Sequence, residues 1–226
     1  MAHDQERIDA AIIGGGAAGL MCAAVAGQRG LRVRVIEHAN RCGKKILMSG
    51  GGRCNFTNLG TSPKQFLSGN RHFCKSALAR YAPQDFVELV ERHGIAYHEK
   101  ELGQLFCDES SKQIVKLLLD ECQDASVRVD TGTTIESIHA EGGGFVLLTP
   151  RERIRTRKLV VATGGLSIPS MGASGFGYEI ARQFGHTVLP TRAGLVPLTL
   201  SGIHQERFHE LSGVALPVTV RCGRQT

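Results

Sequence analysis

The residues whose types and spacing most clearly suggest chemistry lie close to the N-terminus. Gly14, Gly16 and Gly19 match the pattern GxGxxG, and an acid, Glu37, follows eighteen residues after the last glycine. Glycines at this spacing allow a tight turn, a close approach of backbone to a pyrophosphate, and close packing of a helix on a strand. A carboxylate accepts from a ribose 2′-hydroxyl and repels a 2′-phosphate, so the pattern predicts FAD or NAD in preference to NADP. The alternative is a structural glycine turn with an acid nearby by chance.

A second candidate site is the segment 41–58, with the sequence RCGKKILMSGGGRCNFTN. The construction of an ordinary fold does not require the run SGGGRCN. Bare glycines beside Arg53 and Asn55 indicate a loop that packs its backbone against a flat or phosphorylated ligand. In such a loop Arg53 or Lys45 would pair with a phosphate, and Asn55 would donate a hydrogen bond. A mobile surface loop is the alternative interpretation.

The GxGxxG pattern predicts a nucleotide site only where a strand precedes it and a helix follows. Residues 8–13 and 33–36 are short apolar runs typical of buried strands, and apolar residues recur at helical spacing between them. Parallel strands need a crossover connection, and runs that are apolar on both faces suit a sheet covered on both sides. The opening of the chain is therefore predicted to be a βαβ unit.

The rest of the chain is predicted to combine helices with short strands. A helix is predicted at 111–122, and Ser110 and Gln113 at its start have the spacing of a capping box. The other predicted elements are helices at 84–92 and 175–184, a hairpin within 97–107, a β-meander of strands at 127–129, 134–138, 145–149, 154–156 and 159–162, the last of them buried, and strands at 195–200 and 214–220. The sequence pattern changes after residue 190. This change is predicted to divide the chain into a dinucleotide-binding domain, residues 1–190, and the beginning of a β-rich domain, residues 191–226.

Composition excludes several classes of protein. A chain of 226 residues with 42% hydrophobic and 21% charged residues is not disordered. A net charge of +6 would allow nucleic acid as a partner, but Trp is absent, aromatics are 5% and no block of five like charges occurs, so none is expected. Residues 10–27 are uncharged but contain five glycines, and acids precede them, so neither a membrane span nor a secretory signal is predicted.

The cysteines and the arginines after residue 150 are given structural interpretations. Seven cysteines without a CxxC pair, and histidines without HExxH, argue against a disulfide framework or a metal site and indicate a reducing cytoplasm. Cys42, Cys54 and Cys107 could be redox thiols, but burial as small side chains is favoured. Residues 172–177 are predicted as a loop and helix start in preference to a second phosphate site. Four arginines form a basic strand face that is expected to be solvated, with an anionic partner as the alternative: Arg151, Arg153, Arg155 and Arg157.

Four motifs together closely resemble those of the HI0933-like flavoproteins, a family of FAD-dependent oxidoreductases with two-dinucleotide-binding architecture. They are GGGAAG at 14–19, SGGGRCNFTN at 49–58, ATGG at 162–165 and GASGFGYEIARQFGH at 172–186, which leads to LVPL. Residues 156–164, TRKLVVATG, also resemble the second flavoprotein motif, at a strand end where an open α/β sheet admits ligand. An ordinary glycine turn is the alternative there. The resemblance implies an α/β fold, with a Rossmann-like FAD-binding domain made of a parallel sheet and a β-meander, and the start of a β-rich second domain.

The same resemblance implies that FAD binds on the first βαβ unit, with Glu37 on the adenosine ribose. It also implies that a backbone group of Thr134 or Ile135 lies against the adenine. The residues implied to bind the cofactor are Gly14, Gly15, Gly16, Ala17, Ala18, Gly19, Glu37, His38, Lys45, Gly50, Gly51, Gly52, Arg53, Asn55, Ile135, Ala162, Thr163 and Gly164. Family members are usually longer, and this chain is expected to stop early in their middle domain.

The expected function is that of a cytoplasmic flavoenzyme. It would pass hydride from NADH or NADPH through FAD to an organic acceptor, such as a conjugated double bond. A small-molecule substrate is expected, with neither nucleic acid nor membrane as partner; no catalytic residue, metal ligand or oligomeric state is predicted. The alternatives are a truncated or non-catalytic dinucleotide-binding module, and a simple NAD-linked dehydrogenase.

Overall fold

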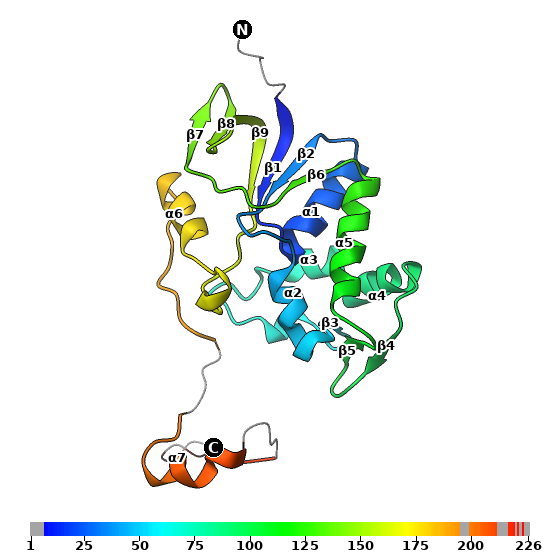
Figure 1. Cartoon of the computed structure of the whole chain (residues 1–226), viewed down its shortest axis with the longest axis vertical. Coiled ribbons are helices and arrows are strands. Elements are labelled where there is room, and N and C mark those ends of the chain that lie inside the picture. The colour runs from blue at the N-terminus through cyan, green and yellow to red at the C-terminus, as the bar shows by residue number, and fades with distance from the viewer. Residues whose placement is uncertain (1–6, 195–198, 212–216, 220, 222, 224–226) are drawn as a thin grey trace. The chain divides into compact units, whose positions relative to one another are not determined.

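The computed structural model describes residues 7–194, 199–211, 217–219, 221 and 223 (Figure 1). The backbone forms two compact units, Met1–Thr187 and Val188–Thr226. The first unit holds both β-sheets and helices α1 to α6, and the second holds α7 (Ile203–Phe208). The assignment of residues 191–226 to a β-rich domain stays a prediction.

A six-stranded sheet forms the centre of the first unit, in the order β6-β2-β1-β9-β8-β7. The first four strands in this order run parallel, and β8 and β7 add an antiparallel edge. The strands are β1 Ile8–Ile13, β2 Val33–Ile36, β6 Arg128–Asp130, β7 Ser137–Glu141, β8 Gly144–Leu148 and β9 Arg153–Val161. The predicted α/β fold, with its parallel sheet and β-meander, is confirmed.

Helices cover both faces of this sheet because the side chains of a strand alternate between its faces. On one face, Ile12 of β1 lies in a core cluster with α1 (Ala17–Gln28) and α5 (Lys112–Asp124). On the other face, Ile13 lies in a second cluster with α6 (Phe176–Gln183). Figure 1 shows α1 and α5 on one side of the sheet and α6 on the other. The predicted βαβ unit therefore has apolar contacts on both faces.

A long crossover between β2 and β6 carries a second, antiparallel sheet of order β3-β5-β4. Its elements are α2 Lys44–Met48, β3 Asn55–Asn58, α3 Lys75–Arg80, α4 Pro83–Arg92, β4 Tyr97–Glu99, β5 Gln104–Cys107 and α5. The predicted helix at 84–92 and the hairpin within 97–107 are confirmed. The sequence did not predict α2, β3 or α3, because elements of four to six residues are too short to establish a period.

Several details of the predicted meander are wrong. The two strands predicted at 154–156 and 159–162 are one strand, because a backbone ladder to β1 continues past the charged residues Arg157 and Lys158. Its carboxyl end is not buried, and Val161 is 41% exposed.

Two other corrections concern the ends of elements. The strand predicted at 134–138 begins only at Ser137. The N–H of Glu136 still donates to the carbonyl of Leu148 on β8, but three residues earlier the chain is bonded next to β2, where the N–H of Thr133 donates to the carbonyl of Glu37. Before α5, half of the predicted capping box is present, because the Gln113 side-chain oxygen accepts from the N–H of Ser110 at 3.4 Å. The other half differs: the Ser110 hydroxyl accepts from the N–H of Lys112 and not from that of Gln113.

The strands predicted at 195–200 and 214–220 lie partly outside the described residues. The described parts of these segments, 199–200 and 217–219, contain no strand, and α7 was not predicted. Among the residues described in the structure, no helix combines the length and apolar character needed to cross a membrane.

Candidate dinucleotide-binding site

The turn between β1 and α1 packs two of its glycines tightly and leaves the third open. Gly14 has a φ of 108°, and a Cβ there would overlap the carbonyl oxygen of Ala162. A Cβ on Gly19 would overlap the carbonyl oxygen of Gly14, whereas a Cβ on Gly16 would meet nothing within 4 Å. These settings fit the three roles of the GxGxxG pattern: the tight turn, the packing of helix on strand, and the open approach to a phosphate.

The amino end of α1 is open to an anion. Gly16 is half-buried, Ala17 and Ala18 are exposed, and in the described part of the chain no side chain caps the helix. The first N–H groups of a helix have no acceptor within the helix, and the helix dipole places positive potential at that end. The residues present therefore fit a diphosphate group.

Glu37, at the end of β2, points toward this turn and is 8% exposed. One carboxylate oxygen accepts from the N–H of Gly15 at 2.7 Å, and the other accepts from the N–H of Ala39 at 2.8 Å. The ring Nδ1 of His38 lies 3.1 Å from the second oxygen. An ionised carboxylate has about four acceptor positions, so Glu37 retains capacity for sugar hydroxyls.

Cys42 lies beside the same turn, and its thiol is not activated as a nucleophile. A Cβ on Gly15 would come within 2.5 Å of its sulfur. Burial, and secondarily the charge of Glu37, raises the pKa of the Cys42 thiol to about 11. Burial likewise raises the pKa of Cys54, and raises that of Cys107 to about 11. The prediction that these three cysteines are buried small residues is confirmed, and neutral thiols are poor nucleophiles.

The loop after α2 exposes a run of glycine backbone. Gly50, Gly51 and Gly52 all have positive φ, at 59°, 64° and 89°, and a Cβ on either of the last two would meet nothing within 4 Å. The carbonyl of Gly52 accepts from the N–H of Ser111 at 2.7 Å, which ties the loop to the start of α5. The loop is thus held on one side and open on the other.

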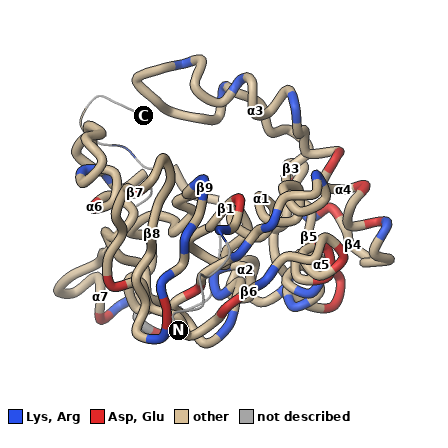
Figure 2. The backbone as a smooth tube through the Cα atoms, turned by 90° about the horizontal axis from the view of Figure 1, so that it is seen from above, with Lys and Arg blue, Asp and Glu red and all other residues tan. Residues whose placement is uncertain are grey.

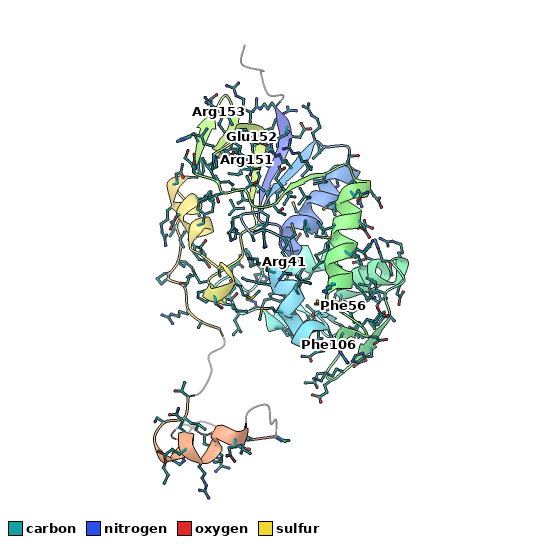
Figure 3. The ribbon with its side chains drawn as sticks, in the orientation of Figure 1. Arg41, Phe56, Phe106, Arg151, Glu152 and Arg153 are labelled. Carbon is teal, nitrogen blue, oxygen red and sulfur yellow. The ribbon has the colours of Figure 1, made fainter. Side chains whose placement is uncertain are left out.

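Phe106 of β5 supports this loop, a role that the sequence did not predict. A Cβ on Gly50 would lie 2.6 Å from the Phe106 ring, which stacks on His98 with a centroid distance of 6.2 Å. Figure 3 shows Phe106 on the second sheet with Phe56 of β3. No signal in the sequence links residue 50 to residue 106, because the contact depends on strand pairing. The side chains of Arg53 and Asn55, at the end of the loop, are exposed.

The loop after β9 approaches both Lys45 and His38. The Nζ of Lys45 donates to the Ser167 hydroxyl at 3.0 Å, and a Cβ on Gly164 would lie 3.3 Å from the same Nζ. Further along the loop, a Cβ on Gly172 would lie 3.0 Å from the Nε2 of His38. The structure thus brings the turn 162–164 together with Lys45 and with the Glu37 region.

Ile135 is connected to the candidate site less directly than the residues described above. It lies in the irregular segment before β7, and its side chain packs against the second core cluster. Its neighbour Thr133 is hydrogen-bonded to the backbone of Glu37, so the segment does border the site. The assignment of any of these residues to a cofactor stays a prediction. Among the described residues no three His, Cys, Asp or Glu side chains gather as metal ligands do.

Comparison with known proteins places the chain in a family. The profile described as "HI0933-like protein Rossmann domain" matches residues 8–213. The chain is 55% identical over 215 residues to the Ribosomal RNA dihydrouridine synthase of Escherichia coli strain K12, covering 95% of this chain and 54% of that protein. It is 29% identical over 219 residues to the 3-dehydro-bile acid delta(4,6)-reductase of Clostridium scindens, covering 95% and 53%. The chain spans about half the length of the curated relatives it matches.

A solved structure shares the fold. The glycine oxidase of Geobacillus kaustophilus superposes with a TM-score of 0.54 at 16% identity, over 80% of this chain and 59% of that one. This likeness supports the Rossmann architecture independently of sequence. With the family profile covering most of its length, the chain belongs to the HI0933-like protein family and contains its Rossmann domain.

Proposed function

We propose that the chain forms the FAD-binding part of a flavoprotein that reduces a carbon–carbon double bond conjugated to a carbonyl group. The observation that carries this proposal is the open backbone at Gly16, next to a buried carboxylate, Glu37, that points to the same turn. A protein that used this turn only to connect a strand to a helix would not need to keep the amino end of α1 uncovered.

The chain's own residues have separate parts in this proposal. The first N–H groups of α1 bind the diphosphate, and Glu37 accepts from the ribose hydroxyls. Lys45 and the backbone of residues 50–52 orient the cofactor along the edge of the sheet. Bound FAD supplies the hydride transfer itself, with NADH or NADPH as the proposed donor. No side chain in the described structure is assigned the role of catalytic acid.

The substrate class is proposed from the names of two relatives. A dihydrouridine synthase and a delta(4,6)-reductase both, by name, saturate a carbon–carbon double bond in a conjugated system. Because identity to the first relative is 55%, we propose that the substrate is a uracil base in ribosomal RNA. This proposal departs from the expectation, based on overall composition, that the protein has no nucleic-acid partner.

The visible spectrum of the purified chain tests the cofactor assignment. Bands of oxidised flavin that bleach when NADH or NADPH is added without oxygen support the flavoenzyme. Flavin bands that neither nucleotide bleaches would favour a binding module without turnover. A colourless protein that binds NAD would instead favour a simple dehydrogenase.

Gly16→Val tests the site itself. A Cβ at this position would meet no protein atom within 4 Å, so the substitution should block the ligand and leave the fold intact. We expect flavin content to fall close to zero with an unchanged circular dichroism spectrum. Gly194→Val is a matched control, since that glycine also has open space and no positive φ, and it should keep its flavin. Normal flavin content in Gly16→Val would contradict the site as described.

A further inference from the structure

The positive charge of the protein is concentrated in one stretch of chain. Residues 38–84 hold eight of the 27 Lys and Arg residues and none of the 21 Asp and Glu residues. Outside this stretch, 19 basic residues are outnumbered by 21 acidic ones, so the whole net charge of +6 arises within it. No block of consecutive charges reveals this, because the cations are spaced among apolar and small residues.

The second half of this stretch, residues 59–84, projects its cations into solvent; we call it the α3 segment. Its four cations are exposed: Lys64, Arg71, Lys75 and Arg80. In Figure 2 the part of the chain around α3 is tan and blue, without red. Within the described part of the chain, none of the four has an ion-pair partner, whereas Arg34, Arg153 and Arg157 of the central sheet all have one.

Aromatic side chains are exposed next to these cations along the chain. Phe66 is 48% exposed, Phe73 is 77% exposed and Tyr81 is 39% exposed. The segment is anchored around them, because the Cys74 side chain is buried and the N–H of Leu59 donates to the carbonyl of Gly103 at 2.9 Å. The aromatic rings are therefore presented to solvent by an attached segment of backbone.

Exposed rings interleaved with unpaired cations match the requirements of a single nucleic-acid strand. Unstacked bases stack on aromatic side chains, while Lys and Arg neutralise the phosphates. A protein partner of ordinary composition fits less well, because covering four unpaired cations removes them from water without providing counter-charges. A regular duplex also fits less well, since its bases are not free to stack on exposed rings.

The α3 segment is also continuous with the candidate cofactor site. The glycine loop at 50–52 leads into β3 (Asn55–Asn58), and β3 leads directly into the segment. Four residues of strand span roughly 13 Å, about the length of two extended nucleotides. A strand of RNA bound to the segment could therefore place one base near the loop that is proposed to contact FAD.

We propose that the α3 segment binds single-stranded RNA, with Lys64, Arg71, Lys75 and Arg80 on phosphates and Phe66, Phe73 and Tyr81 stacked on bases. This inference rests on the proposed function, because it assigns to one surface the RNA that the proposed substrate requires. It differs from that proposal in being testable without turnover.

The first test measures binding of the purified chain to fluorescein-labelled oligouridine of about 12 nucleotides by fluorescence anisotropy. With four phosphate contacts, the slope of log binding constant against log salt should be about −3, at roughly −0.7 for each contact on a single strand. Arg71→Gln/Lys75→Gln should weaken binding about tenfold and reduce the slope by about 1.4. Arg153→Gln/Arg157→Gln is the matched control: it removes the same charge from the central sheet and should have little effect.

The second test examines stacking. Phe73→Ala should weaken oligouridine binding about tenfold with an unchanged salt slope, because a stacked ring contributes no charge. Phe73→Tyr should retain the affinity, since it keeps the ring. Equal weakening by both substitutions would contradict stacking at this position.

The outcomes separate this inference from the proposed function. Flavin bands together with no oligouridine binding, or with equal losses in the α3 and control double variants, would overturn the RNA surface and leave the flavoprotein intact. Oligouridine binding by a colourless protein would do the reverse. Binding to phosphatidylglycerol vesicles but not to RNA would assign the surface to a membrane and also overturn the inference.

Discussion

The central sheet and the α3 segment both carry arginines, but in opposite settings. Arg34 of β2 is 7% exposed and pairs with both Asp130 and Glu152, and Arg153 pairs with Glu141 (Figure 3 labels Glu152 and Arg153). Arg71 of the α3 segment is exposed and has no partner among the described residues. Charges of the first kind stabilise the fold. Charges of the second kind repel one another within the fold, and their presence is explained by a partner outside it.

The largest expected effect is the loss of the buried arginine. Arg34→Leu leaves the carboxylates of Asp130 and Glu152 without their main counter-charge, and should lower the free energy of unfolding by about 3 kcal/mol. Arg71→Leu makes the same chemical change in the α3 segment and should alter the free energy of unfolding by less than about 0.5 kcal/mol. Urea unfolding of both variants measures the difference. Similar losses of unfolding free energy in the two variants would contradict the difference in charge setting between the central sheet and the α3 segment.

A pair of phenylalanines gives the next largest effect. Phe56 is half-buried, and its ring lies 5.5 Å from that of Tyr97 and 6.0 Å from that of Phe86. Phe56→Ala should therefore cost about 2 kcal/mol, somewhat less than a fully buried Phe. Phe73→Ala should cost less than about 0.5 kcal/mol, because its ring is 77% exposed. A large loss of stability in Phe73→Ala would show that this ring packs within the fold.

The sequence predicted the glycine turn well because steric rules determine it. Only glycine fits at residues 14 and 19, where a Cβ would overlap backbone oxygens, and the apolar strands on each side have an unambiguous pattern. The βαβ unit, its helix and the orientation of Glu37 follow from those local constraints. The contact of Gly50 with Phe106, and that of Gly172 with His38, could not be predicted, because they join residues that only the folded chain brings together.

The α3 segment escaped prediction for a different reason. In a sequence, Phe66 and Phe73 look like ordinary core residues, and only the structure shows that they are exposed. The cations are dispersed, so the absence of a charged block concealed the absence of acids over residues 38–84. Counting aromatics and charges over the whole chain averaged this region with a slightly acidic remainder, and the resulting expectation of no nucleic-acid partner depended on that average.

Buried thiols give the body of the fold a pH dependence that exposed residues would not produce. Burial raises the pKa values of Cys42, Cys107 and Cys122 to about 11. The unfolded chain releases these protons at lower pH than the folded chain, so stability should fall as pH rises from about 9 toward 11. Unfolding in urea at about pH 7.5 and pH 10 measures the loss. Cys122→Ala should lower stability at neutral pH through a cavity but show a shallower decline, and an unchanged decline would contradict this origin.

The smallest expected effect is the change in stability when one of two exposed cations is removed. The prediction concerns the sign of that change. Arg153 lies 3.1 Å from a carboxylate oxygen of Glu141, so Arg153→Gln removes a surface attraction worth about 0.2–1 kcal/mol. Lys75 begins α3, where positive charge opposes the helix dipole, and its segment holds three other cations. Lys75→Gln should therefore leave stability unchanged or slightly higher. Unfolding at low and high salt measures both effects, since salt screens attraction and repulsion alike. If both variants were equally destabilised at low salt, Lys75 would have an ion-pair partner within the fold. Its charge would then not require a binding partner outside the protein.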